Sequence, residues 1–107
     1  SVLTGRSDGR IVGYAMLIRG AAAEPVELSK LYALPGFHGT GLAAALMDAA
    51  LARSAEWQAT LIWLGVNQNN QRAQRFYIKC GFTVTGTRHF RLGPHLENDY
   101  LMSREVE

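Results

Sequence analysis

Cysteine is nearly absent from this sequence, which has Cys80 alone among its 107 residues. A single cysteine excludes an internal disulfide framework and any metal site built from several cysteines, and it suits a reducing compartment. Long apolar runs are absent too: the nearest candidate, Leu42 to Ala52, carries Asp48 and is shorter than the roughly 18 residues of a membrane span. We see no signal peptide in Ser1 to Arg10, and we expect a cytoplasmic protein.

A strong charge of either sign is also missing. The 11 Lys and Arg residues against 9 Asp and Glu residues leave a net charge of +2, which is too small to indicate nucleic-acid or membrane binding. Hydrophobic residues make up 48% of the chain and charged residues 19%, so the chain can bury enough apolar surface to fold. We expect a single domain over residues 1–107, with neither a nucleic acid nor a membrane as partner.

Short apolar runs predict the first strands. Ile11 to Ile18 contains β-branched and aromatic residues and lies between Asp8-Gly9 and Gly20, so it predicts a buried strand. Val2 to Thr4 is typical of the end of a preceding strand in a hairpin.

The strand predicted over residues 26–34 breaks the usual alternation. Val26 and Leu28 lie on one face, but the next large apolar residue, Leu31, comes three positions later. A period of two cannot give that spacing, so we predict a β-bulge near residues 29–30. Bulges often lie beside functional sites.

A helix and a strand are predicted next. Residues 42–53 are dominated by Ala and Leu, the best helix formers. Because the only charges there are Asp48 and Arg53, we expect this helix to be buried on most sides. Thr60 to Val66 is a continuous apolar run, typical of a strand buried on both faces in a parallel sheet. Strand, helix and strand then form a right-handed crossover unit.

A second helix is predicted over residues 70–80, with Asn69 or Asn70 as N-cap and Gly81 as the stop signal. Its apolar residues fall at i, i+3, i+4 and i+7, which is one stripe of a helix. They are Ala73, Phe76, Tyr77 and Cys80.

Two last strands, Phe82 to Thr87 and Asn98 to Val106, are predicted on either side of a polar loop around Gly93-Pro94. The sequence has no internal repeat and no linker. The expected architecture is one α+β domain with a parallel strand pair inside a mixed sheet.

Glycine gathers at one place, where Gly36, Gly39 and Gly41 lie between the bulged strand and the Ala-rich helix. Glycine lets a backbone turn sharply and approach a ligand closely. The start of a helix presents unpaired N–H groups and the positive end of its dipole. The pattern favours a pyrophosphate at the turn from Gly39 to Ala43. The alternative is a tight connection that binds nothing.

Two nucleotide motifs compete for this turn. Residues 39–44 match the G-x-G-x-x-A variant of the dinucleotide fingerprint, which would make the chain a dinucleotide-binding fragment. That fingerprint requires an acidic residue about 20 positions on, and the strand expected there ends in Gly65-Val66-Asn67-Gln68 without a carboxylate. A Walker-type loop fails because no Lys-Ser or Lys-Thr pair follows the glycines.

A third pattern fits more of the chain. The signature Q/R-x-x-G-x-G/A of GNAT-superfamily N-acetyltransferases resembles His38-Gly39-Thr40-Gly41-Leu42-Ala43, with His38 where Gln or Arg is usual. The second motif of that family resembles Asn70-x-x-Ala73-x-x-Phe76-Tyr77-x-Lys79-x-Gly81-Phe82. Its bulged fourth strand is similar to Glu27-Leu28-x-x-Leu31-Tyr32, and its final strand to Asp99-Tyr100-Leu101-Met102. The resemblance covers Ile11 to Val106 in consistent order and spacing.

This resemblance implies a three-layer α/β fold, in which a mixed, mostly antiparallel sheet has two central parallel strands that part in a V and helices packed on its faces. It implies acetyl-CoA as cosubstrate, with the pantetheine arm in the gap between the parted strands. Leu31 and Ala33 would offer backbone groups to that arm, and Asn70 would contact it. The residues implied to hold the pyrophosphate are His38, Gly39, Thr40, Gly41, Leu42 and Ala43.

The resemblance also implies two catalytic side chains. Tyr77 matches the family's usual general acid, a phenol that protonates the departing thiolate; otherwise it is a core aromatic. Glu27 occupies a position where several members of the family carry a carboxylate that acts as general base. The alternative is that Glu27 forms a surface ion pair, in which case a chain of water molecules would take the proton from the amine. A backbone N–H of Leu31 or Ala33 would stabilise the tetrahedral oxyanion.

The remaining polar residues give no clear indication of a further site. His89 and His95 lie six positions apart with no carboxylate or cysteine cluster at ligand spacing, so we expect no metal site. Arg72, Arg75 and Lys79 form a positive face on the second predicted helix, which is either solvated or available to the adenosine 3′-phosphate of CoA.

The expected function is acetyl transfer from acetyl-CoA to a primary amine, of a small molecule or a peptide, by direct attack through a tetrahedral intermediate. The alternative is a non-catalytic acyl-CoA-binding or assembly module. The strand and two helices with which the family usually begins, and which shape the acceptor pocket, have no counterpart here. We therefore expect the chain to be N-terminally truncated, or minimal, or completed by a second copy in a homodimer.

Overall fold

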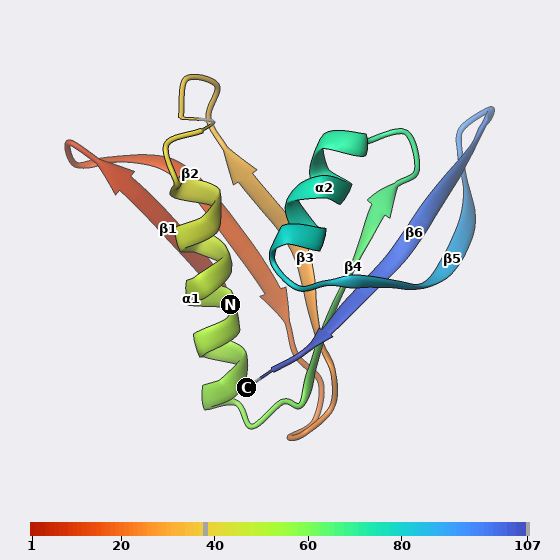
Figure 1. Ribbon diagram of the computed structural model, residues 1–107, viewed down its shortest axis with the longest axis horizontal. Coiled ribbons are helices and arrows are strands. Elements are labelled where there is room, and N and C mark those ends of the chain that lie inside the picture. Colours follow the sequence, from red (N-terminus) through yellow and green to blue (C-terminus); the bar gives the residue numbers. More distant parts are fainter. Residues whose placement is uncertain (38, 107) are drawn as a thin grey trace. The chain divides into compact units, whose positions relative to one another are not determined.

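The computed structural model describes residues 1–37 and 39–106. The elements follow the order β1 (Val2–Ser7), β2 (Arg10–Ile18), β3 (Val26–Ala33), α1 (Leu42–Glu56), β4 (Leu61–Asn67), α2 (Gln71–Lys79), β5 (Thr83–Leu92) and β6 (His95–Glu105) (Figure 1). The strand order in the sheet is β1-β2-β3-β4-β6-β5, with β3 and β4 parallel, which confirms the predicted mixed sheet.

The chain divides into two compact units. The first contains Ser1–Ile62 and the C-terminal residues from Glu105, and the second contains Trp63–Arg104. The first unit therefore carries β1, β2, β3 and α1, whereas the second carries α2, β5, β6 and most of β4.

The β1–β2 hairpin turns where the sequence predicts it. Asp8 and Gly9 both have positive φ, 52° and 78°, as the tightest right-twisted hairpin turns require. β2 then pairs antiparallel with β3, and the register slips between Met16 and Leu17 because Ser29 has no partner in β2. The predicted bulge is confirmed at that residue.

Two paired glycines receive the start of α1. Gly5 of β1 lies opposite Gly13 of β2. A Cβ added at Gly5 would lie 2.5 Å from Leu42 Cδ1, and one at Gly13 would lie 2.7 Å from the Tyr32 carbonyl oxygen and 3.0 Å from Leu42 Cδ2. The glycine pair thus leaves a hollow in the sheet that the Leu42 side chain fills, and α1 lies across β1, β2 and β3 (Figure 1).

The burial of α1 differs from the prediction. One side of the helix is buried, through Leu46, Met47, Ala50 and Ser54. Ala44, Ala45 and Ala49 are exposed on the other side, so the expectation that α1 is buried on most sides is wrong. Alanine has so little side chain that its exposure costs little, and its abundance here reflects helix propensity more than burial.

β4 also has one buried side instead of the two predicted. Ile62, Leu64 and Val66 are buried, whereas the residues that alternate with them are only half-buried. Gly65 lies on the half-buried side under an ion pair that joins β5 to β6, Arg88 Nη2 to Asp99 Oδ2 at 3.0 Å.

The β5–β6 hairpin is longer than predicted. Leu92 lies opposite His95, so Gly93-Pro94 forms a two-residue turn, and the residues expected in a polar loop extend the two strands. The sequence around them is polar because both strands are largely exposed there. Polarity alone therefore did not distinguish an exposed hairpin from a loop.

Gly13→Ala tests the seat of α1. We expect it to lower the free energy of unfolding by about 1–3 kcal/mol, because the new methyl would meet a backbone oxygen that cannot move alone. Urea denaturation measures the change. Gly86→Ala is the matched control, since its Cβ would find its nearest neighbour at an ordinary 3.5 Å. Equal stability of the two variants would contradict the proposed contact.

Candidate active site

The turn before α1 is built on left-handed glycines. Gly39 and Gly41 have φ of 79° and 87°, a region that side chains rarely adopt. A Cβ added at either one would meet nothing within 4 Å. The glycines are therefore required by the backbone conformation, and the space above them is not filled by the described residues.

The first amides of α1 point out of this turn. Ala45 N–H donates to the Gly41 carbonyl at 2.9 Å, which begins the hydrogen bonds of the helix. Gly41 is the N-cap and has no side chain to cap the helix. Within residues 1–37 and 39–106, the N–H groups of Leu42, Ala43 and Ala44 consequently have no acceptor. With the positive end of the helix dipole, these donors suit an anion.

Thr40, one of the predicted pyrophosphate residues, has hydrogen bonds within its own loop. Its backbone N–H donates to the Phe37 carbonyl at 3.3 Å, and its hydroxyl donates to the same oxygen. These hydrogen bonds hold the turn in shape. Thr40 therefore stabilises the loop, and neither its N–H nor its hydroxyl is left to donate to a phosphate. His38 lies outside the described residues.

β3 runs beside this turn and has two different faces. Leu31 and Ala33 lie opposite Ala15 and Gly13, so their side chains are on the face that α1 covers. Leu34 N–H donates to the Val12 carbonyl at 2.8 Å. Because backbone groups alternate along a strand, those of Leu31 and Ala33 point to the other edge of β3, away from β2.

Glu27 lies on the opposite face of β3. It alternates with the buried Val26 and Leu28, and its side chain is half-buried. No cation among the described residues forms an ion pair with it. The surface ion pair considered from the sequence is therefore not formed within that part of the chain.

The second unit carries the other predicted residues on α2. Asn70 is the N-cap, as predicted, and its side-chain oxygen accepts from Ala73 N–H at 3.1 Å. Gln74 Nε2 donates to the carbonyls of Asn67 and Gln68 at 3.1 and 3.0 Å. Sequence reasoning missed Asn67 and Gln74, although a run of Asn and Gln after a strand is a signal of side-chain capping.

Tyr77 packs in an aromatic cluster. Its ring centroid lies 5.6 Å from that of Phe76 and 5.9 Å from that of Phe82. Its hydroxyl has no hydrogen-bond partner among the described residues and is not sealed from solvent. Burial raises the pKa of the Tyr77 phenol above its ordinary value, and the nearby Cys80 thiol raises it further. The phenol therefore stays protonated at neutral pH, as a proton donor must.

The sequence match to known proteins now decides the family. The model of the acetyltransferase (GNAT) family matches residues 1–82, well over half of the chain. This chain belongs to the GNAT acetyltransferase family. Its first unit, apart from the C-terminal residues, lies entirely within the matched range, as does α2 of the second.

Relatives of this GNAT chain include a Mycobacterium tuberculosis protein described as an uncharacterized N-acetyltransferase. It is 68% identical over 106 residues, which are 99% of this chain and 67% of that protein. The crystal structure of Ard1 from Thermoplasma volcanium is 29% identical, with a TM-score of 0.84 over 94% of this chain and 66% of that one. The chain thus spans about two thirds of the length of either protein.

A more distant structure shares the fold alone. The GNAT family acetyltransferase of Elizabethkingia anophelis, solved with acetyl-CoA bound, is 15% identical with a TM-score of 0.86 over 98% of this chain and 75% of that one.

Two features are absent from the described residues of this GNAT chain. No helix among them combines the length and the apolar character needed to cross a membrane. No group of three or more His, Cys, Asp or Glu residues among them could hold a metal ion.

The raised pKa of Tyr77 can be measured directly. We expect the phenolate absorbance of the wild type minus that of Tyr77→Phe to rise with a midpoint above about pH 10, the ordinary value for tyrosine. Unfolding restores that ordinary value. The Tyr77 contribution to the free energy of unfolding is therefore complete below about pH 10 and is lost as pH rises through the raised pKa. A difference midpoint at or below the ordinary value would contradict the burial of this phenol.

Proposed function

We propose that this chain is the catalytic part of an acetyl-CoA-dependent N-acetyltransferase that moves an acetyl group to a primary amine. Family membership supports acetyl transfer. The observation that carries the proposal furthest is the set of unpaired amides at the start of α1, beneath left-handed glycines with open space above them.

The pyrophosphate is proposed to bind this turn. Its oxygens would accept from the N–H groups of Leu42 and Ala43, and Gly39 and Gly41 would let the phosphates approach the backbone. His38 and Thr40 complete the segment, the latter by fixing its shape. No basic side chain is needed here, because three successive amides and the helix dipole supply the positive potential.

The pantetheine arm is proposed to use backbone and amide groups. Leu31 and Ala33 direct their backbone groups to the edge of β3 away from β2, where β4 is its neighbour in the sheet, and we propose that the amide groups of pantetheine bind at this edge. The Asn70 side chain uses its oxygen for the helix cap, so only its NH₂ group would donate to the arm. The backbone N–H of Leu31 or of Ala33 would stabilise the oxyanion of the tetrahedral intermediate.

The reaction moves protons at two atoms, the amine nitrogen, which must lose protons, and the CoA sulfur, which must gain one. A primary ammonium has a pKa near 10 and must lose a proton before its nitrogen can attack the thioester carbon. We propose Glu27 as the base, directly or through water, because its half-buried carboxylate has no cation beside it in the described residues. The C–N bond then forms, the nitrogen of the tetrahedral intermediate gives its second proton to water, the C–S bond breaks, and the CoA thiolate leaves.

Tyr77 is proposed to protonate that thiolate. Its hydroxyl has no partner in the described residues, and its raised pKa keeps the proton on the phenol at neutral pH. The same raised pKa makes the phenol a weaker acid than free tyrosine. Its contribution would come from its position at the sulfur rather than from acid strength.

The acceptor proposed is a primary amine of a small molecule or of a peptide, and the reaction is proposed to run in the cytoplasm. A second copy of the chain that completes the acceptor pocket stays a prediction.

Isothermal titration with acetyl-CoA, CoA and NAD tests which coenzyme binds, and NAD binding without CoA binding would overturn the proposal. Thiol release over a panel of amines tests catalysis, and coenzyme binding without turnover on any amine would favour the non-catalytic module.

Gly41→Ala tests the phosphate turn. We expect the affinity for CoA to fall at least about tenfold, because the added Cβ would occupy space assigned to a phosphate that charge-assisted hydrogen bonds hold. Gly36→Ala is the matched control, since Gly36 has a similar φ of 92° and equally open surroundings. Both variants should lose about 1–2 kcal/mol of stability from backbone strain. Equal CoA affinity in the two variants would contradict the assignment.

Tyr77→Phe tests the general acid. We expect kcat to fall by roughly 10²-fold or more, as for the loss of a positioned acid, while the Kd of acetyl-CoA stays unchanged because the ring remains. Thiol-release kinetics and calorimetry measure the two quantities. A parallel loss of affinity and turnover would identify Tyr77 as a structural residue.

A further inference from the structure

The loop between β4 and α2 is closed by its own hydrogen bonds. It consists of residues 67–70, with the sequence Asn-Gln-Asn-Asn. Asn70 N–H donates to the Asn67 carbonyl at 2.9 Å, and Asn69 N–H donates to Asn67 Oδ1 at 2.8 Å. Asn67 therefore closes the turn twice, once with its backbone and once with its side chain. The turn leads directly into Asn70, the N-cap of α2.

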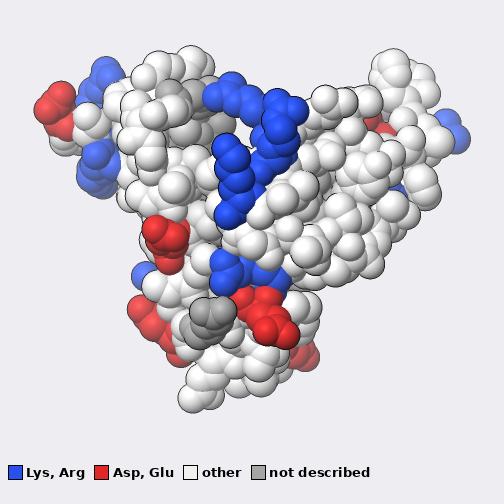
Figure 2. Space-filling model, in the orientation of Figure 1, with Lys and Arg blue, Asp and Glu red and all other residues white. Residues whose placement is uncertain are grey.

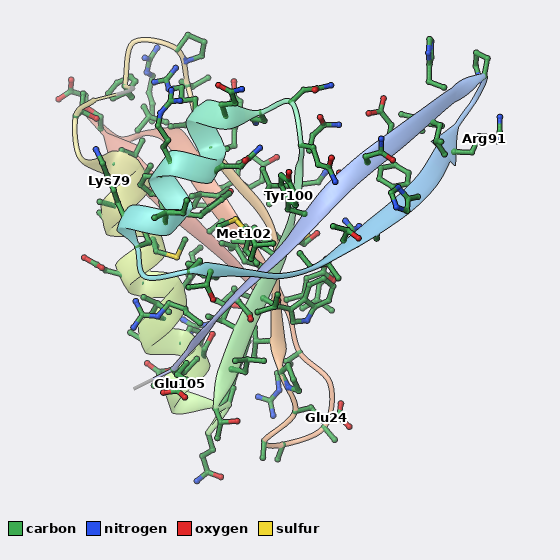
Figure 3. The ribbon with its side chains drawn as sticks, turned by 45° about the vertical axis from the view of Figure 1, so that its right-hand side comes forward. Glu24, Lys79, Arg91, Tyr100, Met102 and Glu105 are labelled. Carbon is green, nitrogen blue, oxygen red and sulfur yellow. The ribbon has the colours of Figure 1, made fainter. Side chains whose placement is uncertain are left out.

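Gln74 ties this loop to α2. Its side chain is half-buried, unlike that of Lys79, which is exposed on the same helix (Figure 3). Figure 2 shows Lys and Arg side chains gathered at the place that α2 occupies in Figure 1. Gln74 Nε2 instead reaches the loop, where it donates to the carbonyls of Asn67 and Gln68. Its backbone N–H donates to the Asn70 carbonyl at 3.2 Å, which joins the loop and the first turn of the helix in one network.

Glu97 of β6 holds the Asn67 side chain from a neighbouring strand. Its Oε2 accepts from Asn67 Nδ2 at 2.7 Å, and both side chains are half-buried. No cation among residues 1–37 and 39–106 forms an ion pair with Glu97. Partial burial of a carboxylate without a cation beside it costs more free energy than partial burial of an uncharged acceptor. Stability alone therefore does not explain the charge at position 97.

A carboxylate fixes the orientation of its partner, because it only accepts hydrogen bonds. The Asn67 NH₂ group must face Glu97, and Asn67 Oδ1 is then left to accept from Asn69 N–H. A neutral amide at position 97 could either donate or accept, so it would allow both orientations of the Asn67 amide. Only one of these orientations closes the turn. The charge of Glu97 therefore selects the conformation of the loop that precedes α2.

We propose that Glu97 is a positioning residue, which acts through Asn67 to hold Asn70 in place for the coenzyme. The inference rests on the proposed function, in which the Asn70 NH₂ group donates to acetyl-CoA. Asn70 is held at three atoms: its N–H by Asn67, its carbonyl by Gln74 and its side-chain oxygen by Ala73 N–H. These contacts all lie within the second unit. A donor that is already fixed loses less entropy on binding, so the network raises the affinity for the coenzyme.

Asn67→Asp tests the contact with Glu97. It brings two carboxylates together, while the hydrogen bond from Asn69 N–H can persist. We expect the Kd of acetyl-CoA, measured by calorimetry on the full chain, to rise about tenfold, as for the loss of one hydrogen bond to a charged group. Asn69→Asp is the matched control, because it adds the same charge to the same loop through an exposed side chain without a partner among the described residues. Its Kd should stay within about twofold of the wild-type value.

Glu97→Gln should rescue Asn67→Asp. In the double variant the donor and the acceptor exchange places, so the hydrogen bond re-forms and the Kd should return to within about twofold of the wild-type value. A residue that merely stabilises the fold would change the urea midpoint and leave the Kd of the folded protein unchanged. Asn70→Ala gives a second check, because in that background Asn67→Asp should raise the Kd no further.

Three results would overturn the inference while the proposed function stands. They are wild-type affinity in Asn67→Asp, no recovery in the double variant, and an equal loss from Asn67→Asp with and without Asn70→Ala. Wild-type affinity in Asn70→Ala would overturn the assignment of Asn70 and, with it, the inference. Failure of the wild-type chain to bind acetyl-CoA would overturn the proposed function as well.

Discussion

The packing of the first turn of α1 on the glycine pair Gly5 and Gly13 is the contact on which the first unit depends. Leu42 fills the hollow that these two residues leave, because side chains at either position would occupy its space. A helix seated so closely has its first amides fixed next to the end of β3. Anion binding at a helix start requires such fixed donors, since donors that must be ordered on binding lose affinity to entropy. The sheet therefore preorganises the turn.

In the second unit, helix capping and aromatic packing fix the positions of the candidate site residues. Asn70 caps α2, Gln74 ties the preceding loop to the end of β4, and Phe76 and Phe82 enclose the ring of Tyr77. The ring is thereby half-buried while the hydroxyl keeps no partner among the described residues. Burial has an electrostatic consequence as well, because it disfavours the phenolate and raises the pKa. One packing arrangement thus fixes both the position and the protonation state of the residue.

Local signals in the sequence predicted local structure well. The three-residue gap before Leu31 correctly predicted a bulge, found at Ser29, and Asn70 and Gly81 correctly marked the two ends of α2. The errors concern exposure. The Ala-rich helix was expected to be buried on most sides and leaves one side open, and the tip of the β5–β6 hairpin was expected to be a polar loop. Composition reports propensity and polarity, whereas exposure depends on what packs against each face.

The sequence by itself determined the family, through two motifs in consistent order and spacing. It also determined the positions where the backbone conformation permits few residue types. A left-handed turn requires glycine and a helix start favours Asn wherever they occur, so these signals can be seen without a fold. Only the tertiary structure decided that Gly5 and Gly13 meet beneath α1, that Thr40 is bound to its own loop, and that the Tyr77 ring packs between Phe76 and Phe82. These facts depend on which distant segments come together, and no spacing along the chain encodes that contact directly.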